Sequence, residues 1–85
     1  MRIVRTNRFK NSYQKLVKSN RKLEKQITKT VILFSQNQNH PSLRLHKLRS
    51  SNYWSISVNM SIRIVFVYEE NVVLLLDIGD HSIYD

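Results

Sequence analysis

The hydrophobic pattern of this chain changes its period once, at the polar segment 35–42, and this change limits the folds open to the chain. Before the segment, apolar residues recur every three or four positions, the spacing of one helix face. Two such stripes, separated at Asn20, predict an antiparallel helical hairpin, with Thr6 or Asn7 capping its first helix and Asn20 its second. The stripes are formed by Phe9, Tyr13, Leu16 and Val17, and by Leu23, Ile27, Val31 and Phe34.

After the polar segment, apolar and polar residues alternate, as in strands that bury one face. Three strands linked by hairpins are predicted there, another precedes the helices, and a short one leads into the second half. Their ranges are 2–6, 43–48, 54–58, 62–68 and 72–78. The order β-α-α-β-β-β predicts an α+β fold, in which a two-helix hairpin covers one face of an antiparallel sheet and leaves the other partly open. With 85 residues, we expect one domain over 1–85.

The composition excludes several kinds of site. The absence of cysteine removes disulfides, thiolate nucleophiles and cysteine-based zinc sites. The single glycine, Gly79, excludes glycine-rich phosphate and dinucleotide loops, and neither a metal nor another cofactor is expected. No apolar run is long enough to span a membrane and no secretory signal precedes the fold, so we expect a cytoplasmic protein without a membrane partner.

The positive charge lies almost entirely in one half of the chain. The net charge is +8, and residues 1–49 hold 13 of the 14 lysines and arginines but a single acidic residue, Glu24. Such asymmetry favours a polyanionic partner, either a nucleic acid or an acidic protein segment. The alternative is that the basic side chains solvate the two helices.

Two ionisable residues in the second half are candidates for catalysis, Arg63 and His81. Arg63 interrupts a strand, where a charge must face solvent, a ligand or a partner charge, because burying it alone is costly. An ion pair with Asp77 or Glu69 is therefore one alternative for Arg63. His81 follows the last strand near Tyr84 and is suited to proton transfer at neutral pH. The alternative for His81 is an exposed histidine in the tail.

A basic strip leads into the strand at 54–58 and is suited to phosphate contacts. Its side chains are those of Arg44, His46, Lys47 and Arg49. The alternative is a solvated edge strand, which such charges protect from aggregation. Next to the strip, Tyr53 and Trp54 are candidates for stacking on bases. Trp54 is in phase with the apolar face of its strand, which favours the core, whereas both interpretations stay open for Tyr53.

These segments together resemble the RelE/ParE toxin superfamily, most closely its RelE-, YoeB- and YafQ-like branch. The resemblance covers nearly the whole chain. The motifs that carry it are LHKL at 45–48, YWS at 53–55, RIVF at 63–66 and DIGDHSIY at 77–84.

The resemblance implies the toxin of a toxin–antitoxin pair, silenced by a cognate antitoxin protein. Many members of this branch cut messenger RNA in the ribosomal A site, where ribosomal RNA surrounds the substrate. They do so without a metal ion. The RNA 2′-hydroxyl attacks the adjacent phosphate, which requires a base, a cation for the charged phosphorane and an acid for the leaving oxygen.

The matching positions imply roles for individual residues. Arg63 corresponds to the arginine that stabilises the transition state, and His81 to a general acid or base. Tyr84 resembles a tail tyrosine that stacks on or orients the substrate, and His46 lies where relatives carry a further acid, base or phosphate-binding group. The expected RNA-binding residues are Arg44, Lys47, Arg49 and Tyr53.

The chain departs from the family pattern in two places. Trp54 and its neighbours occupy a strand on which RelE-like members carry lysines, and Arg44 aligns with the glutamate that YoeB-like members use as a base. His46 is therefore our candidate substitute for the base. Two alternatives remain: a ParE-like toxin that inhibits DNA gyrase without this chemistry, and an inactive relative that only binds an antitoxin.

Overall fold

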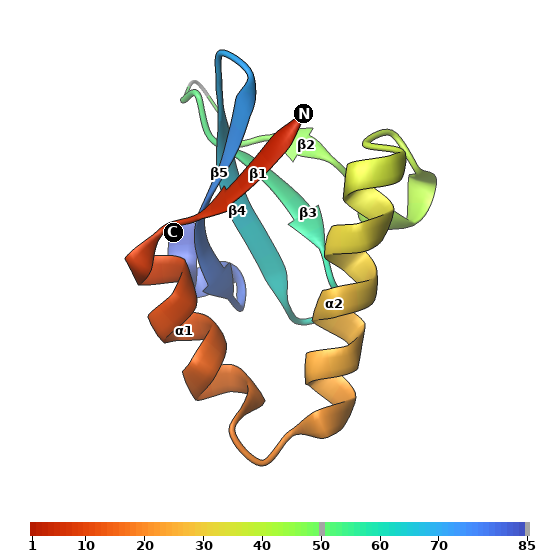
Figure 1. The fold of residues 1–85 in the computed structure, drawn as a ribbon, viewed down its shortest axis with the longest axis vertical. Helices are drawn as coiled ribbons and strands as arrows, with labels where there is room; N and C mark the ends of the chain where they lie inside the picture. The colour runs from red at the N-terminus through yellow and green to blue at the C-terminus, as the bar shows by residue number, and fades with distance from the viewer. Residues whose placement is uncertain (50, 85) are drawn as a thin grey trace.

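A helical hairpin covers one face of a five-stranded mixed sheet in the computed structural model, which describes residues 1–49 and 51–84 (Figure 1). The strands are β1 (Arg2–Arg5), β2 (His46–Lys47), β3 (Trp54–Ser57), β4 (Arg63–Glu69) and β5 (Val72–Gly79). The helices are α1 (Asn7–Val17) and α2 (Arg21–Gln36), with the 3₁₀ turns η1 (Pro41–Leu43) and η2 (His81–Tyr84). The predicted α+β architecture is confirmed.

The order of strands in the sheet is β1-β5-β4-β3-β2. The pairs from β5 to β2 are antiparallel, as predicted, but β1 runs parallel to β5. The prediction of a wholly antiparallel sheet was wrong for this one pair. No hairpin joins β1 to β5, so no turn forces them to run in opposite directions, and the two helices lie in the long connection between them.

Side-chain caps fix where both helices begin. Thr6 Oγ1 accepts a hydrogen bond from the Phe9 amide at 3.2 Å, and Asn20 Oδ1 accepts one from the Leu23 amide at 3.1 Å. These bonds satisfy amides that have no partner within a first helical turn. Of the two candidates for the first cap, the structure selects Thr6.

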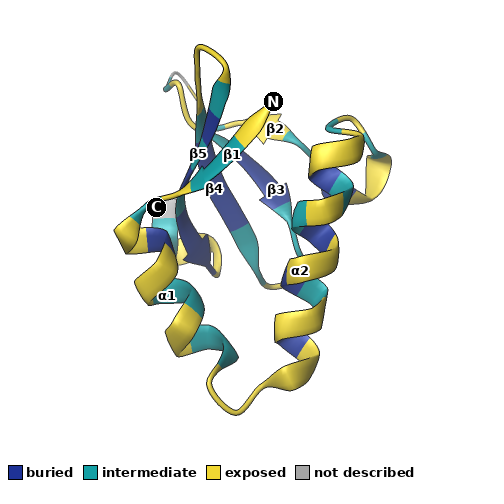
Figure 2. Ribbon diagram, in the orientation of Figure 1, coloured by how far each residue is buried: buried dark blue, intermediate teal, exposed yellow. Residues whose placement is uncertain are grey.

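The core lies between the helices and the covered face of the sheet (Figure 2). Phe34 on α2 meets Phe66 on β4 edge to face, with ring centroids 5.0 Å apart. Trp54 is partly buried against this core and also contacts the ring of Tyr68, which confirms the core interpretation of Trp54. The other buried apolar residues are Phe9, Leu23, Ile27, Leu43, Ile56, Ile64, Val65, Val73, Leu75 and Ile78.

A β-bulge interrupts the pairing of β4 with β5. Val65 faces Asp77 but the next residue, Phe66, faces Leu75, so Leu76 is an extra residue on β5. Strict alternation would put Leu76 and Asp77 on opposite faces, whereas here both line the same cavity. The bulge therefore turns an acidic side chain toward the face that carries the candidate site.

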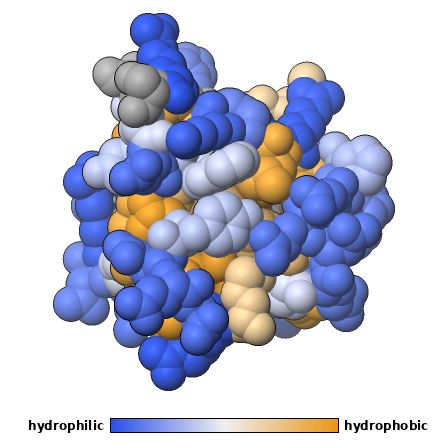
Figure 3. Space-filling view, turned by 90° about the horizontal axis from the view of Figure 1, so that it is seen from above, coloured by the Kyte–Doolittle hydropathy of each residue, from blue (hydrophilic) through white to orange (hydrophobic). Residues whose placement is uncertain are grey.

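The end of the molecule seen in Figure 3 is mostly hydrophilic, with apolar patches between polar side chains. Large apolar side chains at the surface include Met60 and Ile32. No helix within the described residues is long and apolar enough to cross a membrane.

Candidate functional site

The guanidinium of Arg63 is anchored by neighbouring strands rather than by an acidic residue of the sheet. Its Nε and Nη2 donate to Ser55 Oγ on β3, at 3.0 and 2.8 Å, and Nη2 donates to the Arg44 carbonyl at 3.0 Å. Asp77 binds Arg8 instead, and Glu69 lies at the opposite end of β4. The alternative of an Arg63 ion pair with either of these acids was therefore wrong.

His46 lies beside Arg63, with its Nδ1 3.2 Å from Arg63 Nη2 and 3.3 Å from the Arg44 carbonyl. The tautomer decides which contact is a hydrogen bond. When Nδ1 carries the proton, it donates a hydrogen bond to the Arg44 carbonyl, and Nε2 is free to accept one. When Nε2 carries the proton, Nδ1 accepts a hydrogen bond from Arg63, and the Nε2–H group is free to donate one. The two predicted catalytic residues are thus brought into contact.

The loop after η1 builds this contact from its backbone. Arg44 adopts a left-handed conformation with φ 48°, and its amide bonds to the Pro41 carbonyl at 3.2 Å. The carbonyl of Arg44 then accepts a hydrogen bond from Arg63 Nη2. Arg44 was predicted to bind RNA through its side chain, and the structure adds a role for its backbone.

A cavity of about 700 Å³ opens on this face of the sheet. The predicted residues His46, Lys47, Arg49 and Tyr53 line it. Tyr53 is half exposed there, which favours the binding interpretation left open for it. The remaining lining comes from Arg8, Leu48, Ser51, Val65, Leu76, Asp77 and Ile83.

The turn η2 packs back over the end of β5. A Cβ on Gly79 would stand 2.6 Å from Ile83 Cγ2, so any other residue here would force the Ile83 side chain to move. Asp80 Oδ1 then accepts hydrogen bonds from both the amide and the hydroxyl of Ser82. These bonds, with a smaller contribution from the neighbouring His81, lower the pKa of the Asp80 carboxyl.

The remaining predicted catalytic residues belong to this turn. His81 is exposed and is not among the residues that line the cavity, although Ile83 of the same turn is. Gly79 pairs with Arg63 in the sheet register, so the turn begins at the Arg63 end of β4. The side chain of Tyr84 lies outside the described residues.

Two features of the site escaped the sequence analysis. Ser55 is completely buried and anchors Arg63, and Asp77 fixes Arg8 at the cavity. The alternation of apolar and polar residues at 54–58 indicated that Ser55 faces away from the core. This was the one sign in the sequence that it could belong to the site. The pairing of Asp77 with Arg8 depends on the β-bulge and on how α1 packs, and no local pattern encodes either.

No family model matches the sequence, and no curated protein is significantly similar to it. Its structure, however, is similar to solved toxins along its whole length. YafQ from E. coli has a TM-score of 0.80 and 16% identity over 100% of both chains. YoeB from Staphylococcus aureus, solved as a dimer, has a TM-score of 0.77 and 19% identity over 95% of this chain and 97% of its own.

A third structure is the E. coli DinJ–YafQ toxin–antitoxin complex. Its matching chain has a TM-score of 0.78 and 15% identity, over 96% of this chain and 93% of its own. The chain therefore shares its fold with these solved toxins, which is the fold that its motifs predicted.

Proposed function

We propose that this chain is the toxin of a toxin–antitoxin pair and a metal-independent endoribonuclease that cleaves messenger RNA on the ribosome. The contact between Arg63 and His46 beside the cavity carries the proposal. A fixed cation next to a proton-transfer group is what the cleavage of an RNA phosphate requires.

Arg63 is the proposed stabiliser of the phosphorane. Two of its nitrogens are already held by Ser55 and the Arg44 carbonyl, so the guanidinium needs little rearrangement when charge develops on the phosphate. Preorganised groups of this kind supply much of the rate enhancement in electrostatic catalysis.

His46 is the proposed base. In the tautomer that donates from Nδ1 to Arg44, Nε2 is free to take the proton of the RNA 2′-hydroxyl. The 2′-oxygen then bonds to phosphorus while the bond from phosphorus to the 5′-oxygen breaks. The products are a 2′,3′-cyclic phosphate and a 5′-hydroxyl.

His81 is the proposed acid, which gives a proton to the leaving 5′-oxygen. The register that pairs Gly79 with Arg63 supports this role, because it starts η2 at the Arg63 end of β4. Tyr84, in the same turn, is proposed to stack on or orient the substrate.

The partners follow from charge and shape. Lys47 and Arg49 are proposed to bind phosphates along the cavity, with Arg44 beside them, and Tyr53 to stack on a base. The basic outer surfaces of α1 and α2 are suited to ribosomal RNA or to an acidic segment of the antitoxin. The similarity to YafQ in complex with DinJ supports an antitoxin partner.

Inducible expression with primer extension on a translated message tests the proposal. Wild type is expected to arrest growth and to produce new 5′ ends within the message. Arg63→Ala, His46→Ala and His81→Ala should each reduce cleavage by about a hundredfold, the usual contribution of one catalytic group. Glu69→Gln, at the far end of the same strand as Arg63, is the matched control and should cleave like wild type.

Full toxicity in both Arg63→Ala and His81→Ala would contradict the nuclease. Growth arrest with an intact message and inhibited supercoiling would instead indicate a ParE-like gyrase inhibitor. A harmless wild-type chain that forms a stable antitoxin complex would indicate an inactive relative.

A further inference from the structure

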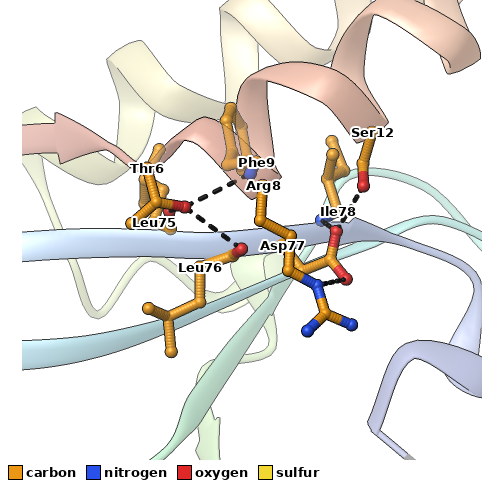
Figure 4. A network of polar contacts seen from close by, with 8 residues as sticks. All are labelled: Thr6, Arg8, Phe9, Ser12, Leu75, Leu76, Asp77 and Ile78. Atoms are coloured by element: carbon orange, nitrogen blue, oxygen red, sulfur yellow. Dashed lines mark hydrogen bonds and ion pairs between the residues drawn. The ribbon is translucent and has the colours of Figure 1, made fainter.

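An arginine of α1 also lines the cavity, and the proposed chemistry does not use it. Arg8, in the first turn of α1, donates from Nε to Asp77 Oδ2 at 3.1 Å (Figure 4). The other oxygen of Asp77 accepts from the Ser12 hydroxyl at 2.6 Å and from the Ile78 amide at 2.9 Å. Both Arg8 and Asp77 line the cavity.

The two partners of this ion pair differ sharply in exposure. The side chain of Asp77 is 12% exposed and accepts three hydrogen bonds, whereas that of Arg8 is 77% exposed. Within the described part of the chain, Arg8 uses only Nε, so both terminal nitrogens of its guanidinium remain available to a ligand. An ion pair this exposed contributes little to stability, and its main effect is to orient the guanidinium.

The sheet register separates Arg8 from Arg63. Ser55 and Asp77, the side chains that hold the two guanidiniums, both pair with Val65, from opposite sides. Two strand spacings therefore lie between them, roughly 10 Å. This spacing of the strand backbones exceeds the span of one phosphate group, so the two arginines are placed to contact different phosphates of one strand.

The charge of the cavity suits a polyanion despite the presence of Asp77. Arg8 neutralises that carboxylate, and Lys47 and Arg49 add two further positive charges to the lining. Planar guanidinium groups bind phosphate through two parallel hydrogen bonds, which the free edge of Arg8 permits.

We propose that Arg8, oriented by Asp77, binds a phosphate of the RNA next to the one that is cleaved. This inference rests on the proposed function and adds a second phosphate site, on the α1 side of the cavity. It makes α1 part of the substrate-binding surface.

A double-mutant cycle, in which Arg8 and single RNA phosphates are changed alone and then together, distinguishes a direct contact from a purely structural role of Arg8. The probe is a ribosome programmed with a message whose 2′-hydroxyls are methylated around the cleavage site, so that the toxin binds without cutting. One phosphate at a time on either side of that site is replaced by an uncharged methylphosphonate. Affinity is measured for wild type and for Arg8→Ala.

Arg8→Ala and the methylphosphonate at one flanking phosphate should each weaken binding roughly tenfold, and together they should weaken it no further. Lys10→Ala removes a charge from the same helix at a position away from the cavity. The loss of affinity that it causes should add to the loss caused by the methylphosphonate. Ser12→Ala removes a hydrogen bond to the same carboxylate without removing a cation, and it too should show no coupling.

Additive losses for Arg8→Ala at every flanking phosphate would overturn the inference while leaving the nuclease intact. So would a loss in Ser12→Ala that equals the loss in Arg8→Ala. Wild-type protein that does not bind the programmed ribosome at all would contradict the proposed function itself, and with it this site.

Discussion

At the scale of single residues, Ser55 decides how well Arg63 is prepared for catalysis. Ser55 is completely buried, and its hydroxyl accepts hydrogen bonds from both Nε and Nη2 of the guanidinium. A long arginine side chain otherwise samples many rotamers, and holding it in one of them has an entropic cost. We therefore regard Ser55 as a positioning residue, because it acts on the reaction only through Arg63.

Ser55→Ala should lower kcat about tenfold with little change in KM, because misplaced groups slow chemistry more than binding. It should also lower the free energy of unfolding by about 1–3 kcal/mol, because Nε and Nη2 of Arg63 both lose the hydroxyl that accepts their hydrogen bonds. Steady-state cleavage and urea denaturation measure the two effects. Ser57→Ala, on the same face of β3, removes a hydroxyl that bonds to the Asn59 carbonyl and serves as control. An equal loss of kcat in both variants would contradict the positioning role.

The sequence identified the residues with distinctive chemistry but not those that hold them. Arg63 was recognisable because a charge is unusual in an apolar strand, and His46 because it stands in the basic strip at a position that the family resemblance marks. Ser55 and Asp77 are ordinary residue types whose importance comes from register and from the β-bulge, and both arise only when strands pair. The contribution of the Arg44 carbonyl belongs to the backbone, so its residue type carries no signal of it.

At the scale of elements, Thr6 joins the start of α1 to the sheet. Its hydroxyl accepts from the Phe9 amide and donates to the Leu75 carbonyl at 2.8 Å. Because Arg8 lies in the first turn of this helix, the junction sets where the guanidinium enters the cavity. Helix caps therefore matter here for the site as well as for stability.

Thr6→Val keeps the shape of the side chain but loses both hydrogen bonds. It should destabilise the fold by about 1–2 kcal/mol, more than the roughly 1 kcal/mol expected for Asn20→Ala, which removes a cap bond alone. Urea unfolding followed by circular dichroism gives both values. Unfolding midpoints that match wild type in Thr6→Val would show that this junction contributes nothing.

The turn η2 should respond to acid through Asp80. Hydrogen bonds from Ser82 lower the pKa of this carboxyl, so the ionised form favours the folded turn. The stabilisation is therefore present above the ordinary aspartate pKa and is lost as the pH falls through the lowered value. NMR titration should show the Asp80 carboxyl and the Ser82 amide shifting together at that pH, and Asp80→Asn should abolish the transition. A carboxyl that titrates at its ordinary pKa would contradict this.

The elements were more predictable than their arrangement. Local hydrogen bonding fixes the caps at Thr6 and Asn20, and apolar spacing alone marks both helices and the strands from β3 to β5. The direction of β1 depends on pairing with β5, some 70 residues away in the sequence, and no local signal reports such a contact.

At the scale of the whole molecule, the positive charge lies in the first half of the chain, whereas most of the proposed catalytic residues lie in the second, with His46 as the exception. Residues 1–49 hold 13 of the 14 lysines and arginines, whereas Arg63 and His81 lie in the acidic second half. The charge therefore acts mainly in docking, and the few polar groups on the open face act on one phosphate.

Binding to ribosomes should weaken steeply with salt, because each phosphate contact releases counterions. Replacing Lys25 and Lys29 on α2 with glutamine should reduce the slope of log affinity against log salt by up to about 2, one for each lost contact. The rate of cleavage at saturating protein should stay unchanged. Equilibrium binding and single-turnover cleavage over a range of salt measure both, and a changed cleavage rate would contradict the division between docking and chemistry.

A message with a single 2′-deoxy nucleotide at the attacked position shows whether the RNA 2′-hydroxyl is the nucleophile. Purified protein and programmed ribosomes should cut the all-ribose message and leave a 2′,3′-cyclic phosphate and a 5′-hydroxyl. They should not cut the 2′-deoxy message at that position, because its nucleophile is missing. Cleavage of the 2′-deoxy message there, or products with a 5′-phosphate, would contradict the account.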